Sequence, residues 1–166
     1  MSTNAPIRVA LIGNPNTGRT TLFNQITGEK QATGNYARVT VSKSSQTVTH
    51  QGREIELIDL PGVYMLNSKT DEEKVTRDLL RNECPDIVIN VINAGNLERN
   101  LMLTTQLIEM GLPRIFALNM KDEADSQGVR IHCDTLSSLL GGPVIEMVAR
   151  DGMGIEALMD EIVRHS

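Results

Sequence analysis

The sequence contains a glycine-bounded stretch, Gly13 to Thr20, whose residue types suit the binding of phosphate groups. It follows the apolar run Ile7 to Ile12 and leads into Thr21 to Ile26, which predicts a strand, a loop and a helix. Glycines let successive backbone N–H groups converge on an anion, and the following helix directs its positive end there. The stretch fits G-x-x-x-x-G-K-[ST] except that Arg19 replaces lysine. An ordinary glycine turn is the alternative, and the other motifs decide between the two.

A carboxylate and a glycine end another predicted strand, in the stretch Asp59 to Gly62. A carboxylate beside a phosphate loop can hold Mg²⁺ through a water, and the Thr20 hydroxyl suits the same ion. Gly62 can offer its N–H to a terminal phosphate with no side chain in the way. Turns of this composition are common, so this motif supports a phosphate site only in combination with the other motifs.

Two further motifs suit the recognition of a base. Asn119 to Asp122 follows a predicted strand, and the carboxylate of Asp122 can accept hydrogen bonds from the ring N–H and the exocyclic amine of guanine. Val148 to Arg150 follows the last predicted strand, where a backbone N–H could meet the guanine carbonyl. A loop containing Thr40 lies between the phosphate-loop stretch and Asp59 to Gly62. The order of these motifs along the chain is that of a small GTPase. The combination predicts a guanine-nucleotide site.

The elements that must position these motifs alternate between apolar runs and helical patterns. This alternation predicts an α/β fold in which a mostly parallel sheet is covered on both faces. We expect six strands, the second of them antiparallel in a hairpin, flanked by about five helices. The expected strands are 7–12, 41–50, 54–59, 86–92, 113–118 and 144–147, and the expected helices are 21–26, 71–81, 97–110, 133–140 and 155–163.

Two stretches between these elements, Gly28 to Val39 and Leu60 to Lys69, are predicted to be loops. The first has too little apolar content to pack, so we expect it to be mobile. In the helix 97–110, four apolar side chains recur at helical spacing and are predicted to be core: Met102, Leu103, Leu107 and Met110.

Composition excludes several classes of protein. The chain has 166 residues, which is most economical as one domain, and ordinary hydrophobic and charged shares of 40% and 22%. Its net charge of −5, without a long basic run, argues against nucleic acid as a partner. No run reaches the roughly 18 apolar residues that span a bilayer, so we expect a soluble chain without a signal peptide. Cys84 and Cys133 are too far apart in sequence to suggest a metal site.

Several stretches are similar to one family, the cytosolic G domain of the bacterial ferrous iron transport protein B, FeoB. The resemblance includes stretches outside the generic GTPase motifs and covers nearly the whole chain. The stretches are Gly13 to Asn24, Gly34 to Val41, Asp59 to Tyr64, Asp71 to Asp78, Asn96 to Leu101 and Asn119 to Ala124.

This resemblance implies a Ras-like fold in which residues 1–166 form a single G domain. It also implies a helical spacer domain and a membrane permease that belong to the same polypeptide in the family and are absent from this chain. The full-length protein would place the domain on the cytoplasmic face of the bacterial inner membrane. Homo-oligomerisation is an open possibility, and no cluster of Cys, His or carboxylates predicts direct iron binding.

The resemblance also implies individual roles in binding GTP or GDP with Mg²⁺. Thr20, Thr40 and Asp59 would hold Mg²⁺, the last through a water, and Gly62 would sense the γ-phosphate. The implied nucleotide contacts are Asn14, Asn16, Thr17, Gly18, Arg19, Thr20, Thr21, Asp59, Gly62, Asn119, Met120, Asp122, Val148, Ala149 and Arg150.

In the family, an activating K⁺ is held near the phosphate loop. The matching positions here are Asn16 and the backbone carbonyls near Gly34 and Tyr36. Such a cation could supply the charge that an arginine finger provides elsewhere. The residues implied in catalysis are Asn16, Arg19, Thr40 and Gly62.

Three departures from the family pattern stand out. Arginine at position 19 keeps the charge of the usual lysine but is longer and forked, so we expect weaker GTP binding and slow hydrolysis. Val148 stands where the family has a small polar residue, which predicts altered nucleotide release. Tyr36 replaces tryptophan and Ala37-Arg38 replace Pro-Gly, which leaves the shape of the first switch loop open.

Two functions therefore compete. The leading one is a slow, cation-assisted GTPase that gates iron passage through the missing membrane part. The other is a sensor module that binds GTP or GDP with negligible hydrolysis. A ribosome- or RNA-associated GTPase is a third reading, against which the acidic net charge and the family-specific stretches argue.

Overall fold

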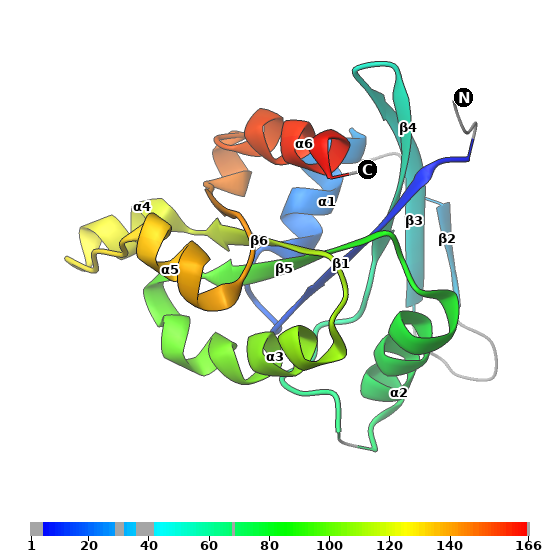
Figure 1. Cartoon of the computed structure of the whole chain (residues 1–166), viewed down its shortest axis with the longest axis horizontal. Helices are drawn as coiled ribbons and strands as arrows, with labels where there is room; N and C mark the ends of the chain where they lie inside the picture. Colours follow the sequence, from blue (N-terminus) through cyan, green and yellow to red (C-terminus); the bar gives the residue numbers. More distant parts are fainter. Residues whose placement is uncertain (1–4, 29–31, 36–41, 68, 166) are drawn as a thin grey trace.

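A mixed β-sheet forms the centre of the molecule, a computed structural model that describes residues 5–28, 32–35, 42–67 and 69–165 (Figure 1). In this described part the sheet has seven strands in the order β2-β3-β4-β1-β5-β6-β7. β3 is antiparallel to β2 and β4, and all other neighbours are parallel. The strands are β1 (Ile7–Gly13), β2 (Ala32–Asn35), β3 (Ser42–His50), β4 (Arg53–Asp59), β5 (Ile87–Asn93), β6 (Arg114–Asn119) and β7 (Val144–Glu146).

Helices connect the strands and cover both faces of the sheet (Figure 1). Within the described residues the α-helices are α1 (Arg19–Thr27), α2 (Asp71–Asp78), α3 (Leu97–Met110), α4 (Lys121–Ser126), α5 (Cys133–Leu140) and α6 (Ile155–Arg164). α2 continues into a π-helical turn, η1 (Leu79–Glu83), and 3₁₀ turns precede α3 (η2, Ala94–Asn96) and follow β7 (η3, Ala149–Asp151). None of these helices is long and apolar enough to cross a membrane.

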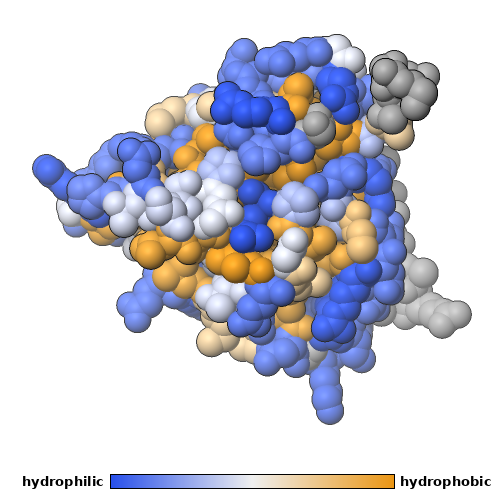
Figure 2. Space-filling model, viewed as in Figure 1, coloured by the Kyte–Doolittle hydropathy of each residue, from blue (hydrophilic) through white to orange (hydrophobic). Residues whose placement is uncertain are grey.

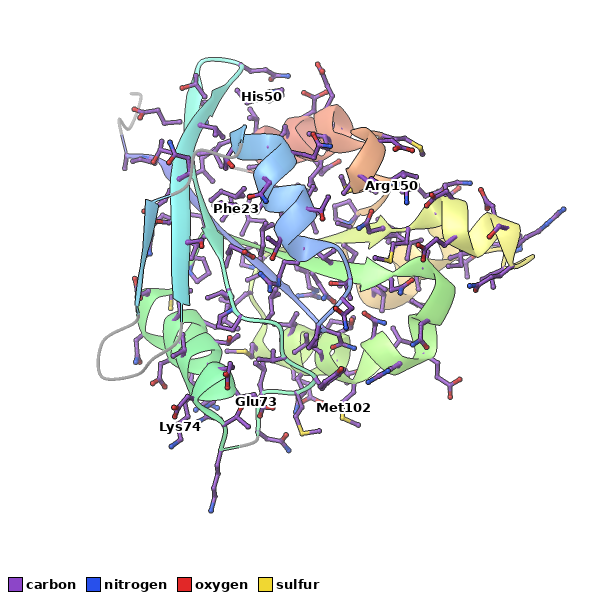
Figure 3. The ribbon with its side chains drawn as sticks, turned by 180° about the vertical axis from the view of Figure 1, so that it is seen from behind. Phe23, His50, Glu73, Lys74, Met102 and Arg150 are labelled. Carbon is purple, nitrogen blue, oxygen red and sulfur yellow. The ribbon has the colours of Figure 1, made fainter. Side chains whose placement is uncertain are left out.

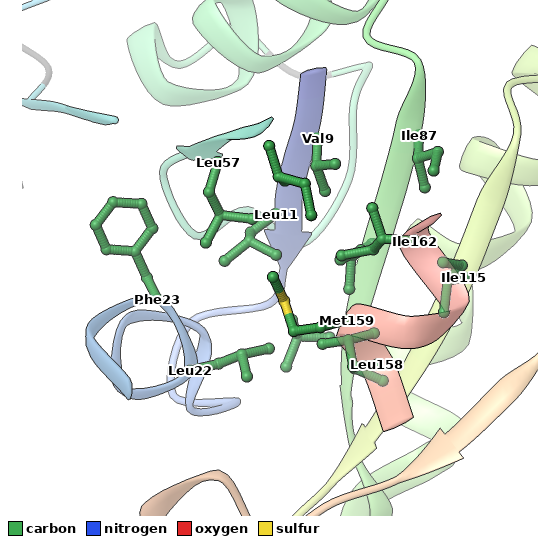
Figure 4. Packing of buried hydrophobic residues seen from close by; sticks show 14 of the residues in the cluster. Val9, Leu11, Leu22, Phe23, Leu57, Ile87, Ile115, Leu158, Met159 and Ile162 are labelled. Carbon is green, nitrogen blue, oxygen red and sulfur yellow. The ribbon is translucent and has the colours of Figure 1, made fainter. Parts of the chain in front are cut away.

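The alternation of side chains along β1 explains how the sheet acquires two apolar faces. Ile7, Val9 and Leu11 pack on one side with α1 and α6, where Phe23 and Leu158 are fully buried (Figure 4). Ala10 and Ile12 point to the opposite side, which is covered by residues of η1 and α3. Toward the β7 edge, the same side is covered by residues of α4 and α5. The space-filling view shows hydrophilic residues around most of the rim and hydrophobic residues between the helices (Figure 2).

The predicted α/β Ras-like fold is confirmed, and the predicted hairpin is formed by β3 and β4. The sheet has one strand more than predicted, because Ala32–Asn35 lies in the stretch that we expected to be a mobile loop. This segment has no apolar pattern of its own and forms β2 through backbone pairing with β3, from Ala32↔Ser45 to Asn35↔Ser42. The six-residue helix α4 was also not predicted, because its first two residues belong to the stretch interpreted only as a base-binding motif and the other four follow it directly.

The prediction that Met102 belongs to the core is wrong. Leu103 and Leu107 are buried, but Met102 is 57% exposed and lies on the outer surface of α3 (Figure 3). The inward face of α3 also carries Asn100 and Thr104, which are buried. Thr104 donates a hydrogen bond to Asn90 Oδ1 of β5 at 2.5 Å, so the buried face of α3 includes a polar contact with the sheet.

Candidate functional site

The phosphate loop leaves β1 at Gly13 and enters α1 through two residues with left-handed backbone angles. Asn16 has φ of 66° and Gly18 has φ of 85°. A Cβ at Gly18 would lie 2.3 Å from Asn119 Nδ2, so only glycine fits here. The loop is also closed internally, because the Thr17 hydroxyl donates to the Asn14 carbonyl at 2.9 Å. The N–H groups of the first turn of a helix have no partner within the helix, so those of α1 are available to an anion beside this loop.

An arginine–aspartate ion pair lies beside the predicted phosphate loop. Arg19, the first residue of α1, donates from Nη1 to Oδ1 of Asp59, at the end of β4. Both side chains are largely buried, with exposed fractions of 14% and 8%. Burial raises the pKa of Asp59, and the charge and hydrogen bond of Arg19 and the Thr20 hydroxyl counteract this only in part. Arg19 Nε is buried without a hydrogen-bond partner among the described residues.

The turn after β4 packs directly against the phosphate loop. Leu60 N donates to the Leu11 carbonyl at 3.1 Å, and Val63 N donates to the Gly13 carbonyl at 3.0 Å. A Cβ at Gly62 would lie 3.1 Å from the Pro15 backbone. The backbone of the D-x-x-G motif is thus held against the phosphate loop, and a side chain at Gly62 would require Pro15 to shift.

Helix α3 contacts both of these segments. The Arg99 carbonyl accepts a hydrogen bond from Asn14 Nδ2 at 3.3 Å, and the Arg99 guanidinium lies 4.8 Å from the centroid of the Tyr64 ring. Sequence reasoning missed Arg99. It lies in a stretch that supported the family resemblance, but no motif pattern assigns its side chain a partner.

Asn119, at the end of β6, joins the phosphate loop to the loop that follows β7. Its Nδ2 donates to the Thr17 carbonyl at 2.9 Å, and its Oδ1 accepts from Ala149 N at 2.9 Å. The residue is 3% exposed. Both ends of its amide are therefore used to hold two loops from different strands in one position.

A cavity of about 170 Å³ lies beside this connection, at the carboxyl edge of the parallel strands. Its lining includes Gly18, Thr21, Met120, Asp122, Val148 and Ala149. Asp122, in the first turn of α4, is partly exposed here and forms an ion pair with Arg150, from Nη2 to Oδ2 at 2.5 Å. Burial alone would raise the pKa of Asp122, but the Arg150 hydrogen bond and two backbone amides lower it. The carboxylate is therefore charged at neutral pH.

The closing loop after β7 is fixed by its own backbone. Val148 and Met153 exchange two hydrogen bonds of 3.1 Å, and Asp151 N donates to the Val148 carbonyl at 3.0 Å. The valine is 7% exposed. An apolar residue at position 148 is thus packed, and these backbone bonds do not depend on a side-chain hydroxyl.

The structure brings most of the predicted site residues to one edge of the sheet. Asn14 to Thr21, Asp59, Gly62, Asn119 to Asp122 and Val148 to Arg150 converge there, with Asn16 and Thr20 exposed. Thr40 and Tyr36, predicted for Mg²⁺ and K⁺, lie outside the described residues. Gly34, the third predicted K⁺ position, is in β2.

Comparison with known proteins identifies the family of this chain. Residues 7–162 match the family model described as ferrous iron transport protein B. The chain belongs to this family. The Fe(2+) transporter FeoB of Salmonella typhimurium is 48% identical to it over 164 residues, which cover 96% of this chain and 21% of that protein. The chain therefore spans about a fifth of the length of this FeoB relative.

Solved FeoB structures share the fold. An S. thermophilus NFeoB mutant bound to mGDP superposes with a TM-score of 0.91 at 45% identity, covering 96% of this chain and 61% of that one. The FeoB G-domain from Methanococcus jannaschii superposes with a TM-score of 0.86 at 41% identity, covering 96% and 97%. These values confirm the family resemblance inferred from the sequence.

Proposed function

We propose that this chain binds GTP and GDP, hydrolyses GTP slowly, and regulates a bacterial ferrous iron transporter. The observation that carries the proposal is the Asn119 connection, which holds the phosphate loop and the cavity containing Asp122 together at one sheet edge. A guanine base in that cavity would present its two donors to Asp122 while its phosphates lie over the first turn of α1. The mGDP complex of the NFeoB relative supports the same ligand class.

Mg²⁺ is the metal that this site fits by its donor set. The Thr20 hydroxyl is exposed at the start of α1, and the Asp59 carboxylate lies next to it, so two oxygen donors of the kind that Mg²⁺ prefers are together. When bound, the ion would neutralise charge on the phosphates. Arg19 occupies one oxygen of Asp59, and we propose that it turns toward the phosphates when a nucleotide is present.

Slow turnover is proposed from the geometry of Arg19. A guanidinium is planar and forked, whereas the usual lysine is a compact point charge, so the two cannot donate to the phosphates in the same way. The test is multiple-turnover hydrolysis of GTP by the parent and by Arg19→Lys. We expect the variant to hydrolyse GTP faster, and an equal or lower rate would contradict the proposed cause.

Activation by K⁺ is proposed for the exposed side of the phosphate loop. Asn16 is exposed, and its left-handed backbone turns the loop outward at this point. Hydrolysis should therefore be faster in KCl than in NaCl at equal ionic strength, and Asn16→Ala should remove the difference. Equal rates in both salts would exclude K⁺ activation.

The competing proposal is a nucleotide sensor, and the buried Arg19–Asp59 pair is the observation that favours it. A pair that persists with nucleotide bound would keep the arginine away from the γ-phosphate. GTP hydrolysis no faster than in buffer, together with tight GTP binding, would select the sensor over the enzyme.

The role in iron transport rests on the whole length of the relatives, of which this chain spans about a fifth. We propose that the chain is one G domain whose native polypeptide continues into a spacer and a membrane permease, placing the domain at the cytoplasmic membrane face. The downstream gene sequence is the test. A polytopic hydrophobic region supports the assignment, and a stop codon directly after the last residue rules it out.

A further inference from the structure

The carboxylate proposed to recognise guanine is bonded to a neighbouring side chain. Arg150 Nη2 donates to Asp122 Oδ2 at 2.5 Å across the mouth of the cavity. We propose that the Arg150 side chain competes with the base for Asp122, and so sets both the affinity for guanine and its preference over hypoxanthine. This inference rests on the proposed function and concerns the same site. Arg150 is thus a specificity-determining residue that acts through Asp122.

The backbone of Arg150 is anchored, so the competition involves its side chain alone. The Arg150 carbonyl accepts a hydrogen bond from Gln25 Nε2 of α1 at 2.9 Å. The preceding Ala149 N–H is bonded to Asn119, and Gly152 N donates to the Ala149 carbonyl at 3.1 Å. By contrast, the Arg150 side chain is 65% exposed. Figure 3 shows it extending from the closing loop toward α4.

Displacement of Arg150 from Asp122 leaves the arginine with another partner. Its Nε lies 3.5 Å from Asp151 Oδ1, in the same turn. A guanidinium that moves into solvent can keep this contact, so its charge is not left isolated. Exposed ion pairs of this kind are weak because water and salt screen them. The base can therefore displace Arg150, but at a measurable loss of affinity.

The selectivity follows from counting donors and acceptors. A carboxylate has two oxygens, and guanine offers two donors in this direction, the ring N–H and the 2-amino group. Guanine therefore needs Oδ2 as well as Oδ1. Each oxygen has two lone pairs, so guanine and Arg150 compete for the side of Oδ2 that faces the cavity, which Asp122 and Arg150 both line. Hypoxanthine lacks the 2-amino group and offers only the ring N–H, which needs one oxygen. Arg150 can remain bonded to Asp122 Oδ2 beside hypoxanthine, so it penalises guanine more than hypoxanthine.

The test compares binding of mant-GDP and mant-IDP to the chain and to Arg150→Gln. We expect GDP affinity to rise by about two- to fivefold, the scale of an exposed pair, while IDP affinity stays unchanged. The GDP-to-IDP preference should rise by the same factor. If Arg150 instead packs on the base, both affinities should fall together, and that result would overturn the inference. Unchanged affinities for both nucleotides would also overturn it.

Two controls separate this effect from a general loss of charge. Arg164→Gln removes an exposed arginine, 74% accessible and paired to Glu161, from the end of α6. It should leave both affinities as in the parent, and a rise in GDP affinity equal to that of Arg150→Gln would count against the inference. Thermal melting of each variant without nucleotide confirms that folding is unaffected.

A second background tests whether Arg150 acts through Asp122. Asp122→Asn replaces one carboxylate oxygen by an amide donor, which suits the 2-oxo group of xanthine. In that background Arg150→Gln should leave mant-XDP affinity unchanged. A gain in XDP affinity equal to the gain in GDP affinity seen in the parent background would refute action through Asp122. A parent chain that binds no mant-GDP would overturn the proposed function and this inference together. Parent binding that Arg150→Gln does not alter would overturn the inference alone.

Discussion

The two ends of the proposed nucleotide site each contain an arginine–aspartate pair, but the pairs lie in opposite surroundings. At the phosphate end, Arg19 and Asp59 are largely buried between the phosphate loop and the end of β4. At the base end, Arg150 and Asp122 lie at the mouth of a cavity, with exposed fractions of 65% and 37%. Both arginines are bonded to a carboxylate to which the family resemblance gives a role with nucleotide or metal.

The difference in burial separates a pair that should contribute to the stability of the nucleotide-free fold from one that should not. A buried charge left without its partner is costly, because water cannot replace the lost interaction. An exposed charge is solvated again at once, so breaking its pair has little effect on folding. The phosphate-end pair should therefore affect the stability of the fold, whereas the base-end pair should affect only ligand binding. The four predictions below test this division.

The largest effect is expected for Arg19→Gln in the absence of nucleotide and metal. Removing the guanidinium leaves Asp59 buried without its charged partner, and we expect a loss of about 3 kcal/mol in unfolding free energy. For a chain of this length that corresponds to about 6 to 12 °C in Tm. Urea unfolding in EDTA measures it. Arg19→Lys, which keeps the charge, should lose less, and a stable Arg19→Gln variant would show that the pair contributes nothing.

A smaller loss, about 2 kcal/mol, is expected for Asn119→Ala. The change leaves the Thr17 carbonyl and the Ala149 N–H without their bonds in the interior. GDP affinity should fall as well, because the two ends of the site are no longer held together. Asn90→Ala is the matched variant, since Asn90 is a buried amide of β5 that bonds to Thr104. It should destabilise the fold with less effect on GDP affinity, and an equal loss of affinity would contradict the bridging role of Asn119.

The third prediction concerns the pH dependence of stability that Asp59 introduces. Because burial raises its pKa in the folded chain above the ordinary 3.8, the folded state favours the protonated form. Its contribution is fully present below pH 3.8 and is lost as pH rises through the raised pKa. Relative to Asp59→Asn, the parent should lose stability over that window, by at most about 1.4 kcal/mol per pH unit. A parent that gains stability relative to the variant would show that Arg19 outweighs burial.

Much of the site's framework could be predicted because it depends on local patterns. The apolar run ending at Gly13 and the carboxylate ending the strand at Asp59 define parallel strands, and the carboxyl ends of such strands meet at one edge. The family resemblance then assigned roles within that edge. Residue types and their order in the sequence were therefore sufficient to predict which segments meet at this edge of the sheet.

The features that could not be predicted from the sequence depend on contacts between segments that are distant along the chain. Ala32–Asn35 becomes a strand only because the backbone of β3 is available beside it. Met102 precedes the core residue Leu103, but the buried face of α3 consists of Asn100, Leu103, Thr104 and Leu107, and the methionine lies outside it. The pairs Arg19–Asp59 and Arg150–Asp122 join residues 40 and 28 positions apart. No local pattern specifies such side-chain partners.

The smallest effect on folding is expected for Arg150→Gln, which should leave the stability of the chain unchanged. Because the pair is exposed, the Tm of the variant without nucleotide should equal that of the parent, in contrast to Arg19→Gln. The difference between the two chains should appear only in GDP binding, and it should shrink as NaCl is raised from about 0.05 to 0.5 M, since salt screens the interaction of exposed charges. Measurements of mant-GDP affinity for both chains across this range provide the test. A lowered Tm, or an affinity difference that does not depend on salt, would place the base-end pair in the same class as the phosphate-end pair.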